Sequence, residues 1–362
     1  MSKMRVIAFY LPQFYPTPEN DEWWEPGFTE WTNVVQAKPL FKDHYQPRIP
    51  RDLGFYDLRV PETREKQAQM AREAGIAGFC YWHYWFAGRR LLNRVFDEVV
   101  ESGKPDFPFC LCWANHSWKA KTWDSNSPDK LLIEQTYPGV EDYKAHFYTM
   151  LPAFRDKRYM RVNGKPIFGI FEPTNFDDFQ RFAETWNQLA KENGLDGFYF
   201  FGLAQGTKLY NQMDSSLYDA IVFDKSTDLY RDYDSPLIKK IYRWMLLKLH
   251  RPLILNYDQY VSKSIIMYKC NDSLIPCIDP DFDHSPRSSY NWIIFGNSTP
   301  EKWEKLCKST LDILASREKN NQLLFIKSWN EWGEGNYLEP DQRFGRAYLN
   351  ATANVFSNSK II

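Results

Sequence analysis

Short apolar runs alternate with longer amphipathic segments from one end of the chain to the other. The runs have four to eight residues, are rich in Phe, Ile and Val, and are in several cases almost continuously hydrophobic. Runs of this kind are typical of strands that are buried on both faces of a parallel sheet. We expect eight strands, at residues 4–10, 78–85, 107–114, 166–171, 198–203, 220–223, 274–278 and 323–329.

The segments between these runs carry helical patterns with recognisable start and stop signals. Proline stands at or near the first turn of the segments that begin near residues 61, 236 and 300. Gly75 and Gly194 follow the last residues of the segments 61–74 and 176–193. We expect helices over residues 61–74, 91–101, 141–154, 176–193, 236–249, 300–317 and 344–355.

Eight strands that alternate with helices predict an α/β fold, and eight is the number that closes a (β/α)8 TIM barrel. The alternative is a doubly wound open sheet, but no Gly-x-Gly-x-x-Gly follows the first strand. We therefore expect one catalytic domain over residues 1–362. Three segments are too long for minimal loops, at about residues 11–60, 115–140 and 227–270. The first two follow strands, so they belong to the C-terminal face, where barrel enzymes have their active sites.

Composition and charge exclude several classes of function. The chain has 362 residues and a formal net charge of −1, which does not favour binding to nucleic acid or to an anionic membrane. A cluster of basic residues has the pattern of a solvated helix face, which we prefer to a binding patch: Lys239, Lys240, Arg243, Lys248 and Arg251.

The sequence shows no secretory or membrane-spanning pattern and its cysteines fit a reducing compartment, so we expect a cytoplasmic protein. No apolar stretch approaches the roughly 18 residues of a membrane span, and the first apolar run is too short for a secretory signal. The six cysteines fit reduced thiols in that compartment. Cys110 and Cys112 share one face of a strand at a spacing that zinc pairs do not use, so we interpret them as core residues.

Aromatic residues make up 17% of the chain, including 14 Trp, and many stand beside polar residues where strands end. A sugar ring stacks on an aromatic face while its hydroxyl groups need hydrogen-bond partners, so this combination favours carbohydrate. The Gly-Lys-Ser/Thr loop of phosphate-binding enzymes and the Gly-x-Ser-x-Gly turn of serine hydrolases are both missing from the sequence.

Glu331 and Glu334 are the candidates for catalysis. They follow the last strand, between tryptophans, and Gly333 and Gly335 indicate that the chain turns there. In a helical turn, residues three apart are neighbours, with Cβ atoms about 5–6 Å apart. Retaining glycosidases use two carboxyl groups roughly 5–5.5 Å apart and inverting ones use two roughly 6.5–9.5 Å apart. Close carboxylates also disfavour double ionisation, which raises one of the two pKa values. A pair of solvated loop glutamates is the alternative that we consider weaker.

Other polar and aromatic residues at strand ends are expected to bind substrate. For Glu172 a helix-capping role is an equally good interpretation, and His83 fits a hydrogen-bonded wall residue better than a metal ligand. Asp279 and Asp281 match the Asp-x-Asp of nucleotide-sugar transferases, but we expect them to bind sugar hydroxyls and expect no metal. The full set is Tyr10, Glu30, Trp31, Trp82, His83, Tyr84, Trp113, Asn115, Trp118, Glu172, Asp279, Asp281, Trp329, Asn330 and Tyr337.

Four segments together resemble the WbsX family, whose members are described as glycosyltransferases of bacterial surface-polysaccharide gene clusters. The segments are residues 8–14, residues 27–34, residues 78–86 with 113–115, and residues 329–335 with 337–340. That family is similar to glycoside hydrolase family 99, the endo-α-mannosidases and endo-mannanases, which are (β/α)8 barrels with a Glu-Trp-His-Glu-Gly motif. Here the motif reads Glu331-Trp332-Gly333-Glu334-Gly335, with Gly333 in place of histidine.

This resemblance implies roles for three residues. Glu334 would be the general acid/base on the glycosidic oxygen, and Glu331 the base on the sugar 2-hydroxyl, which gives retention through an anhydro sugar. Tyr10 matches an active-site tyrosine near the first strand. We expect an enzyme that cleaves or transfers glycosidic bonds of a bacterial oligo- or polysaccharide, O-antigen or lipopolysaccharide included, without a cofactor. A nucleotide-sugar-dependent glycosyltransferase and a non-catalytic glycan-binding barrel are the two alternatives.

Overall fold

Eight parallel strands close into a barrel in the computed structural model, which describes residues 4–120, 129–226, 228, 236–290, 292–317 and 322–357. Neighbours in the barrel follow the order of the chain, and the last strand pairs with the first through Arg5↔Leu323 to Ala8↔Ile326. The (β/α)8 barrel and all eight strands are confirmed. They are β1 (Arg5–Tyr10), β2 (Gly78–Phe86), β4 (Phe109–Trp113), β8 (Lys165–Ile170), β9 (Tyr199–Gln205), β10 (Ala220–Asp224), β12 (Leu274–Ile278) and β14 (Leu323–Ile326).

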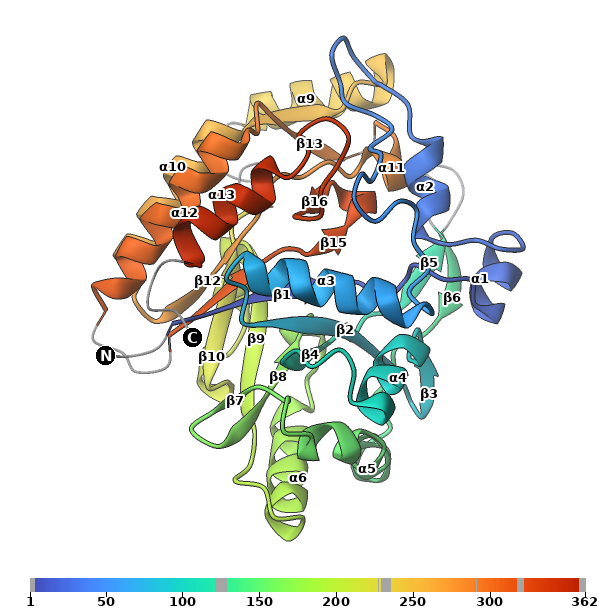
Figure 1. The fold of residues 1–362 in the computed structure, drawn as a ribbon, viewed down its shortest axis with the longest axis vertical. Coiled ribbons are helices and arrows are strands. Elements are labelled where there is room, and N and C mark those ends of the chain that lie inside the picture. The colour runs from blue at the N-terminus through green and yellow to red at the C-terminus, as the bar shows by residue number, and fades with distance from the viewer. Residues whose placement is uncertain are drawn as a thin grey trace.

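One helix follows each barrel strand and covers its outer side (Figure 1). None of the helices in the described ranges is long and apolar enough to cross a membrane. The covering helices are α3 (Pro61–Glu73), α4 (Arg94–Ser102), α5 (Val140–Arg155), α6 (Phe179–Glu192), α7 (Thr207–Gln212), α10 (Tyr257–Cys270), α12 (Pro300–Ala315) and α13 (Ala347–Phe356).

Two expectations about the helices were wrong. Leu91 belongs to β3 (Arg89–Leu91), which pairs antiparallel with β2, and Leu92 has a φ of 52° that interrupts the chain before α4. The segment 227–270 is not one insertion, because it contains α10, the barrel's own helix. In the described part of this segment, α9 (Pro236–Leu249) and β11 (Leu253–Asn256) precede α10, and β11 pairs with β13 (Ile293–Gly296).

The remaining short elements lie mainly in loops that follow barrel strands. The first loop contains α1 (Pro18–Trp23) and α2 (Glu30–Gln36), and the third strand is followed by a hairpin of β5 (Trp118–Ala120) and β6 (Lys130–Ile133). The others are β7 (Arg161–Val162), η1 (Pro173–Asn175), η2 (Ser215–Leu217), α11 (Ser285–Ser288), β15 (Asn330–Glu331), η3 (Trp332–Glu334) and β16 (Asn336–Tyr337).

Side chains inside the barrel alternate with side chains that face the helices, as successive residues of a strand must. Phe9 and Trp82 stack inside, with ring centroids 4.5 Å apart, and Phe9 also packs on Phe325 of β14. Cys110 and Cys112 are buried free thiols, as expected for core residues. Burial raises the pKa of the Cys112 thiol, so it stays protonated.

Candidate active site

A cavity of about 740 Å³ opens at the C-terminal ends of the barrel strands. Glu331 ends β15 and Glu334 ends η3, so a single turn after β14 brings both carboxylates into this cavity. Gly335 follows with a φ of 66°, a left-handed conformation that glycine adopts without strain. The turn that the glycines indicated is therefore present, and it points both candidate catalytic groups at one space.

Arg287 of α11 links the two carboxylates to each other and to a third acidic residue. Its Nη1 lies 2.6 Å from Glu334 Oε1, its Nη2 lies 3.2 Å from Glu331 Oε2, and its Nε lies 2.7 Å from Glu30 Oε1. All three nitrogens of the planar guanidinium thus contact carboxylates, an arrangement that the single ammonium group of Lys does not provide. One cation thereby organises three acids at the centre of the cavity.

Burial and neighbouring charges separate the two pKa values. Burial and the charge of Glu334 raise the pKa of Glu331 to about 7. Burial alone would raise the pKa of Glu334 as well, but Lys327 and Arg287 outweigh it and lower that pKa to about 2. At neutral pH Glu334 is therefore ionised, and Glu331 holds its proton more readily than a solvated glutamate does. A pair of acids with separated pKa values is the usual basis for distinct proton-transfer roles.

Lys327 supplies the second cation of the cavity. It follows β14, and its Nζ lies 3.4 Å from Glu334 Oε2 and 3.9 Å from Asp224 Oδ2 at the end of β10. Its side chain is only 11% exposed, so the ammonium is held against these carboxylates and not in open solvent. The cations that line the cavity beside Glu334 are consequently already neutralised by acids.

Gly333 makes room for the Glu30–Arg287 ion pair. A Cβ atom at this position would lie 1.8 Å from Glu30 Oε1 and 2.9 Å from Arg287 Nε. Any other residue would therefore have to displace the pair. The glycine that departs from the Glu-Trp-His-Glu-Gly motif is thus coupled to the ion pair that fills the same space.

Aromatic rings form much of the cavity wall, and one of them contacts the catalytic candidates directly. Trp82 Nε1 donates a hydrogen bond of 2.8 Å to Glu331 Oε1. Tyr84 and Trp118 pack edge to face, with centroids 5.1 Å apart. The aromatic residues that line the cavity are Trp24, Phe28, Trp82, Tyr84, Trp118, Phe171, Phe282 and Trp292.

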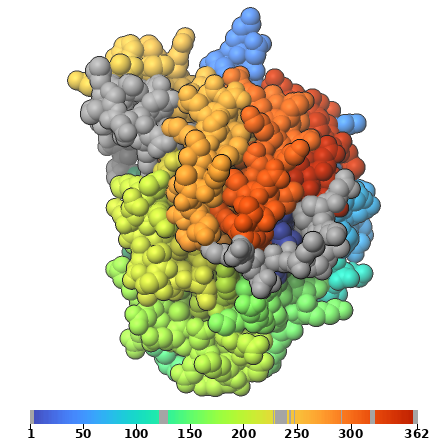
Figure 2. Space-filling model, turned by 90° about the vertical axis from the view of Figure 1, so that its left-hand side faces the viewer, coloured from blue at the N-terminus to red at the C-terminus, as the bar shows by residue number. Residues whose placement is uncertain are grey.

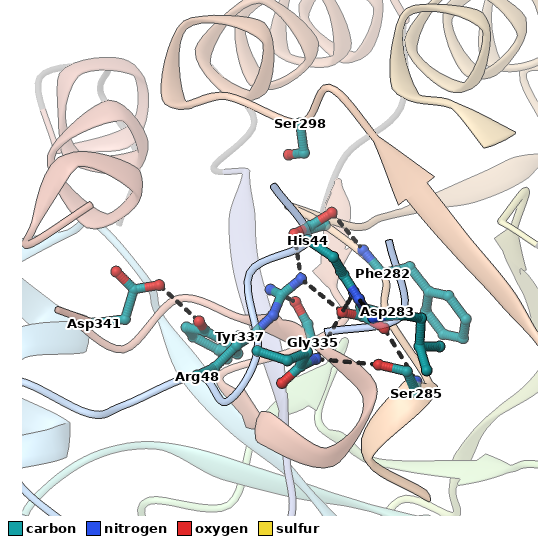
Figure 3. A network of polar contacts seen from close by, with 12 residues as sticks. His44, Arg48, Phe282, Asp283, Ser285, Ser298, Gly335, Tyr337 and Asp341 are labelled. Atoms are coloured by element: carbon teal, nitrogen blue, oxygen red, sulfur yellow. Dashed lines mark hydrogen bonds and ion pairs between the residues drawn. The ribbon is translucent and has the colours of Figure 1, made fainter. Parts of the chain in front are cut away.

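A buried polar network fixes the turn that carries Glu334 (Figure 3). Asp283 donates its backbone N–H to the carbonyl of Glu334 at 2.6 Å, while its carboxylate accepts from His44 at 2.9 Å and from Gln46 at 2.7 Å. Arg48 donates to the carbonyl of Gly335 at 2.9 Å. The hydrogen bond from His44 and the charge of Arg48 hold the pKa of Asp283 far below its usual value, although burial opposes them. The first long loop is thereby attached to the catalytic turn.

The structure brings seven of the predicted residues to the cavity wall: Glu30, Trp82, Tyr84, Trp118, Glu172, Glu331 and Glu334. Glu172 also borders a smaller hollow of about 440 Å³, which shares Phe171, Glu172 and Gln205 with the main cavity. Its carboxylate bonds the side chain of Asn175, within the short η1 that it precedes.

The other predicted residues lie outside the cavity lining. Tyr10 donates to Gln67 of α3, and His83 bonds His146 of α5 at 2.7 Å, because both alternate with the inward-facing Phe9 and Trp82. Asn115 ties the end of β4 to the backbone of Glu172. The residues outside the lining are Tyr10, Trp31, His83, Trp113, Asn115, Asp279, Asp281, Trp329, Asn330 and Tyr337.

Asp279 and Asp281 do not form a common site. Asp279 is fully buried and accepts a hydrogen bond of 2.7 Å from Tyr260, whereas Asp281 pairs with Arg48 at 2.9 Å. Residues two apart in a strand point to the same side. The strand β12 ends at Ile278, so Asp279 and Asp281 lie beyond it and point to different neighbours. Within the described ranges, no group of three His, Cys, Asp or Glu side chains could hold a metal ion.

Arg287 and Lys327 are the residues that the sequence analysis missed. The position of Lys327 could have been predicted from the sequence. It lies two residues after the inward-facing Phe325, just beyond the end of a strand, so its side chain is expected on the inner side of the barrel. The position of Arg287 could not, because α11 is a four-residue helix in a loop and the partners of Arg287 are 44, 47 and 257 positions away.

A (β/α)8 barrel with two coupled carboxylates in an aromatic cavity has the architecture of a carbohydrate-active enzyme. Comparison with known proteins agrees with that class. The chain belongs to the family described as "Glycosyltransferase WbsX", whose model matches residues 6–352. The resemblance stated from the motifs is thereby confirmed.

Curated relatives and solved structures extend the comparison. Two proteins named "Uncharacterized protein WxcX", from Xanthomonas campestris pv. campestris strains B100 and ATCC 33913, are each 34% identical over 98% of this chain. The chain spans about half the length of these relatives, at 50% of each.

Among solved structures, a glycoside hydrolase-like protein matches with a TM-score of 0.62 and 15% identity, over 98% of this chain and 94% of its own. The GH99 endo-alpha-mannosidase from Bacteroides thetaiotaomicron matches with a TM-score of 0.54 and 15% identity, over 98% of this chain and 96% of its own. At this identity the two structures show a common fold.

Proposed function

We propose that this protein cleaves or transfers glycosidic bonds of a bacterial surface polysaccharide or its precursor, with retention of configuration, through Glu331 and Glu334. The observation that carries the proposal is the bridge that Arg287 makes between the two carboxylates, whose pKa values are about 7 and about 2. Retaining chemistry needs two nearby acids with different roles, and solvated loop glutamates would not be linked in this way.

Glu331 serves as the base toward the sugar hydroxyl. A pKa of about 7 is close to the pH at which a general base works best. The hydrogen bond from Trp82 to Oε1 fixes the orientation of its carboxylate, so Oε2 is the oxygen that faces Arg287.

Glu334 serves as the acid/base on the glycosidic oxygen, the role that the family-99 resemblance implies. Lys327 and Arg287 lower the pKa of Glu334. An acid on the glycosidic oxygen needs a higher pKa, so the bound sugar is expected to weaken the contacts of Glu334 with these cations, because loss of a nearby cation raises the pKa of a carboxyl group. Arg287 then remains available to Glu30, which holds its Nε.

The size and lining of the cavity support an oligosaccharide substrate. About 740 Å³ is ample for several sugar rings, and the smaller hollow continues from it at Phe171 and Glu172. The aromatic wall offers stacking faces, while Asn20, Asn33 and Gln13 offer hydrogen-bond partners to hydroxyl groups.

Substitution of each carboxylate tests the two roles. Glu334→Gln should lose about 10²-fold or more in rate on polysaccharide but retain most of its rate on dinitrophenyl glycosides, whose leaving group needs no acid. Glu331→Gln should lose activity on both substrates. Glu65→Gln, on the exposed face of α3, is the matched control. Near-wild-type rates for both cavity variants on every substrate would contradict the proposal, and the reverse pattern would assign the acid to Glu331.

Transfer to an acceptor hydroxyl, with a nucleotide sugar as donor, is the second candidate function, and the description of the family favours it. The same two carboxylates can transfer a sugar to a held acceptor instead of water. Asp279 and Asp281 do not line the cavity, since Asp279 accepts a hydrogen bond from Tyr260 and Asp281 accepts one from Arg48. A requirement for nucleotide sugar would therefore have to be met by other residues.

A further inference from the structure

Helix α9 lies at the periphery of the molecule, outside the ring of helices that covers the barrel (Figure 1). In the turned view it projects from the upper left of the body (Figure 2). Residues 236–257 include five Lys or Arg and no Asp or Glu, although the net charge of the whole chain is only −1. This projecting segment is consequently strongly basic in an almost neutral protein.

The exposed side of α9 is apolar as well as basic. Ile241, Trp244 and Leu249 are 48%, 54% and 47% exposed, and Lys240 and Lys248 are exposed beside them. Residues four apart lie on one line along a helix, so Lys240, Trp244 and Lys248 form one stripe. The next stripe holds Ile241 and Leu249. Large apolar side chains exposed together on a surface usually mark a binding site.

We infer that α9 and the adjoining strand β11 bind an anionic lipid bilayer. A helix with Trp, Leu and Ile interspersed with Lys lies in the interface of a membrane, where the rings enter the headgroup region and the ammonium groups meet anionic lipids. Ile254 of β11, 47% exposed, adds a further apolar side chain. A second copy of the chain fits less well, because a two-fold contact would press this basic surface against itself.

The bilayer-binding surface is continuous with the rim of the active-site cavity. His250, just after α9, stacks on Tyr290 with ring centroids 4.5 Å apart. Leu253 of β11 pairs with Ile293 of β13, and the preceding Trp292 is 44% exposed and lines the cavity. A membrane under α9 would therefore lie beside the mouth of the cavity, where a saccharide attached to lipid would be presented.

Vesicle flotation of the full chain tests the inference without any substrate, so its outcome does not depend on the proposed function. Binding is expected to phosphatidylcholine vesicles that contain phosphatidylglycerol, and to fall as salt rises. Lys240→Gln with Lys248→Gln should weaken binding about 30-fold, since each surface cation contributes about fivefold. Trp244→Ser should weaken it about tenfold by removing buried apolar area.

Two control variants separate the surface from general effects. Lys305→Gln with Lys308→Gln removes two exposed charges from α12, and Tyr148→Ser removes a ring that is 50% exposed on α5. Both should bind vesicles like the wild type, and thermal unfolding should show that all variants are folded. Equal losses in α9 and control variants, absence of vesicle binding, or concentration-dependent dimerisation abolished by Trp244→Ser would overturn the inference.

Discussion

Arg287 is the residue through which the acidic side chains of the cavity act on one another. It contacts Glu30, Glu331 and Glu334 at 2.6–3.2 Å, and it lowers the pKa of both candidate catalytic groups. Two carboxylates that close would otherwise resist ionising together. The charge of Arg287 keeps Glu334 ionised, while the pKa of Glu331 remains about 7.

Loss of Arg287 should change the pH profile of kcat/KM. The wild type should lose activity above about pH 7, because kcat/KM depends on the form in which the pair of carboxyl groups holds one proton, and the last proton leaves near the Glu331 pKa of about 7. Arg287→Met removes a cation that lowers this pKa, so the alkaline limb should move to higher pH. Titration of ¹³C-labelled glutamate by NMR measures the same shift directly. Arg94→Met, at an exposed pair with Glu98, should leave the limb unchanged, and an unmoved limb in Arg287→Met would contradict the account.

Gly333 should be intolerant of even one added methyl group. Gly333→Ala places Cβ 1.8 Å from Glu30 Oε1, so the Glu30–Arg287 pair has to separate and activity should fall at least about tenfold. In a Glu30→Ala background the nearest clash is gone, and Gly333→Ala should then cost little more. A double-mutant cycle of rates measures this coupling. Independent, additive losses would show that the glycine serves another purpose.

The turn from β15 through η3 to β16 owes its position to the first long loop. Residues of that loop, His44, Gln46 and Arg48, converge on Asp283, whose backbone N–H in turn holds Glu334. The long loop thereby reaches the turn that carries both candidate catalytic glutamates. Long ordered loops on barrels commonly serve the active site in this way.

Asp283→Asn should destabilise the protein by about 1–3 kcal/mol at pH 7, because it removes the carboxylate that accepts from His44 and Gln46, while Arg48 keeps its ion pair with Asp281. The pKa of Asp283 is depressed in the folded state, so its contribution is present above the unfolded value of 3.8 and is lost as pH falls towards the folded one. The difference in unfolding free energy between variant and wild type should thus shrink below about pH 4. Urea denaturation at pH 7 and pH 3 measures it, and a constant difference would contradict this origin.

The barrel itself follows from the hydrophobic pattern, whereas much of the site does not. All eight strands were predictable because each is a short run that is buried on both sides. That Glu331 and Glu334 share one cavity was predictable from the glycines in the turn, whereas the outward direction of Tyr10 and His83 follows from a strand face that the motif alone does not give. Arg287 depends on contacts between segments hundreds of residues apart, such as its pair with Glu30, and local sequence does not contain them.

The most direct test of the central claim is a proton NMR time course of the protein with α-mannans and bacterial O-polysaccharides, each with and without nucleotide sugars. The account predicts new reducing-end signals, with the first anomer formed having the configuration of the bond that is cleaved, and signals that appear about 10²-fold or more slowly with Glu334→Gln. If the sugar is transferred with retention to an acceptor instead of water, the roles of the two carboxylates stand and only the acceptor differs from the proposal. An inverted first product, or a reaction unaltered in both Glu331→Gln and Glu334→Gln, would contradict the proposed roles of the two glutamates.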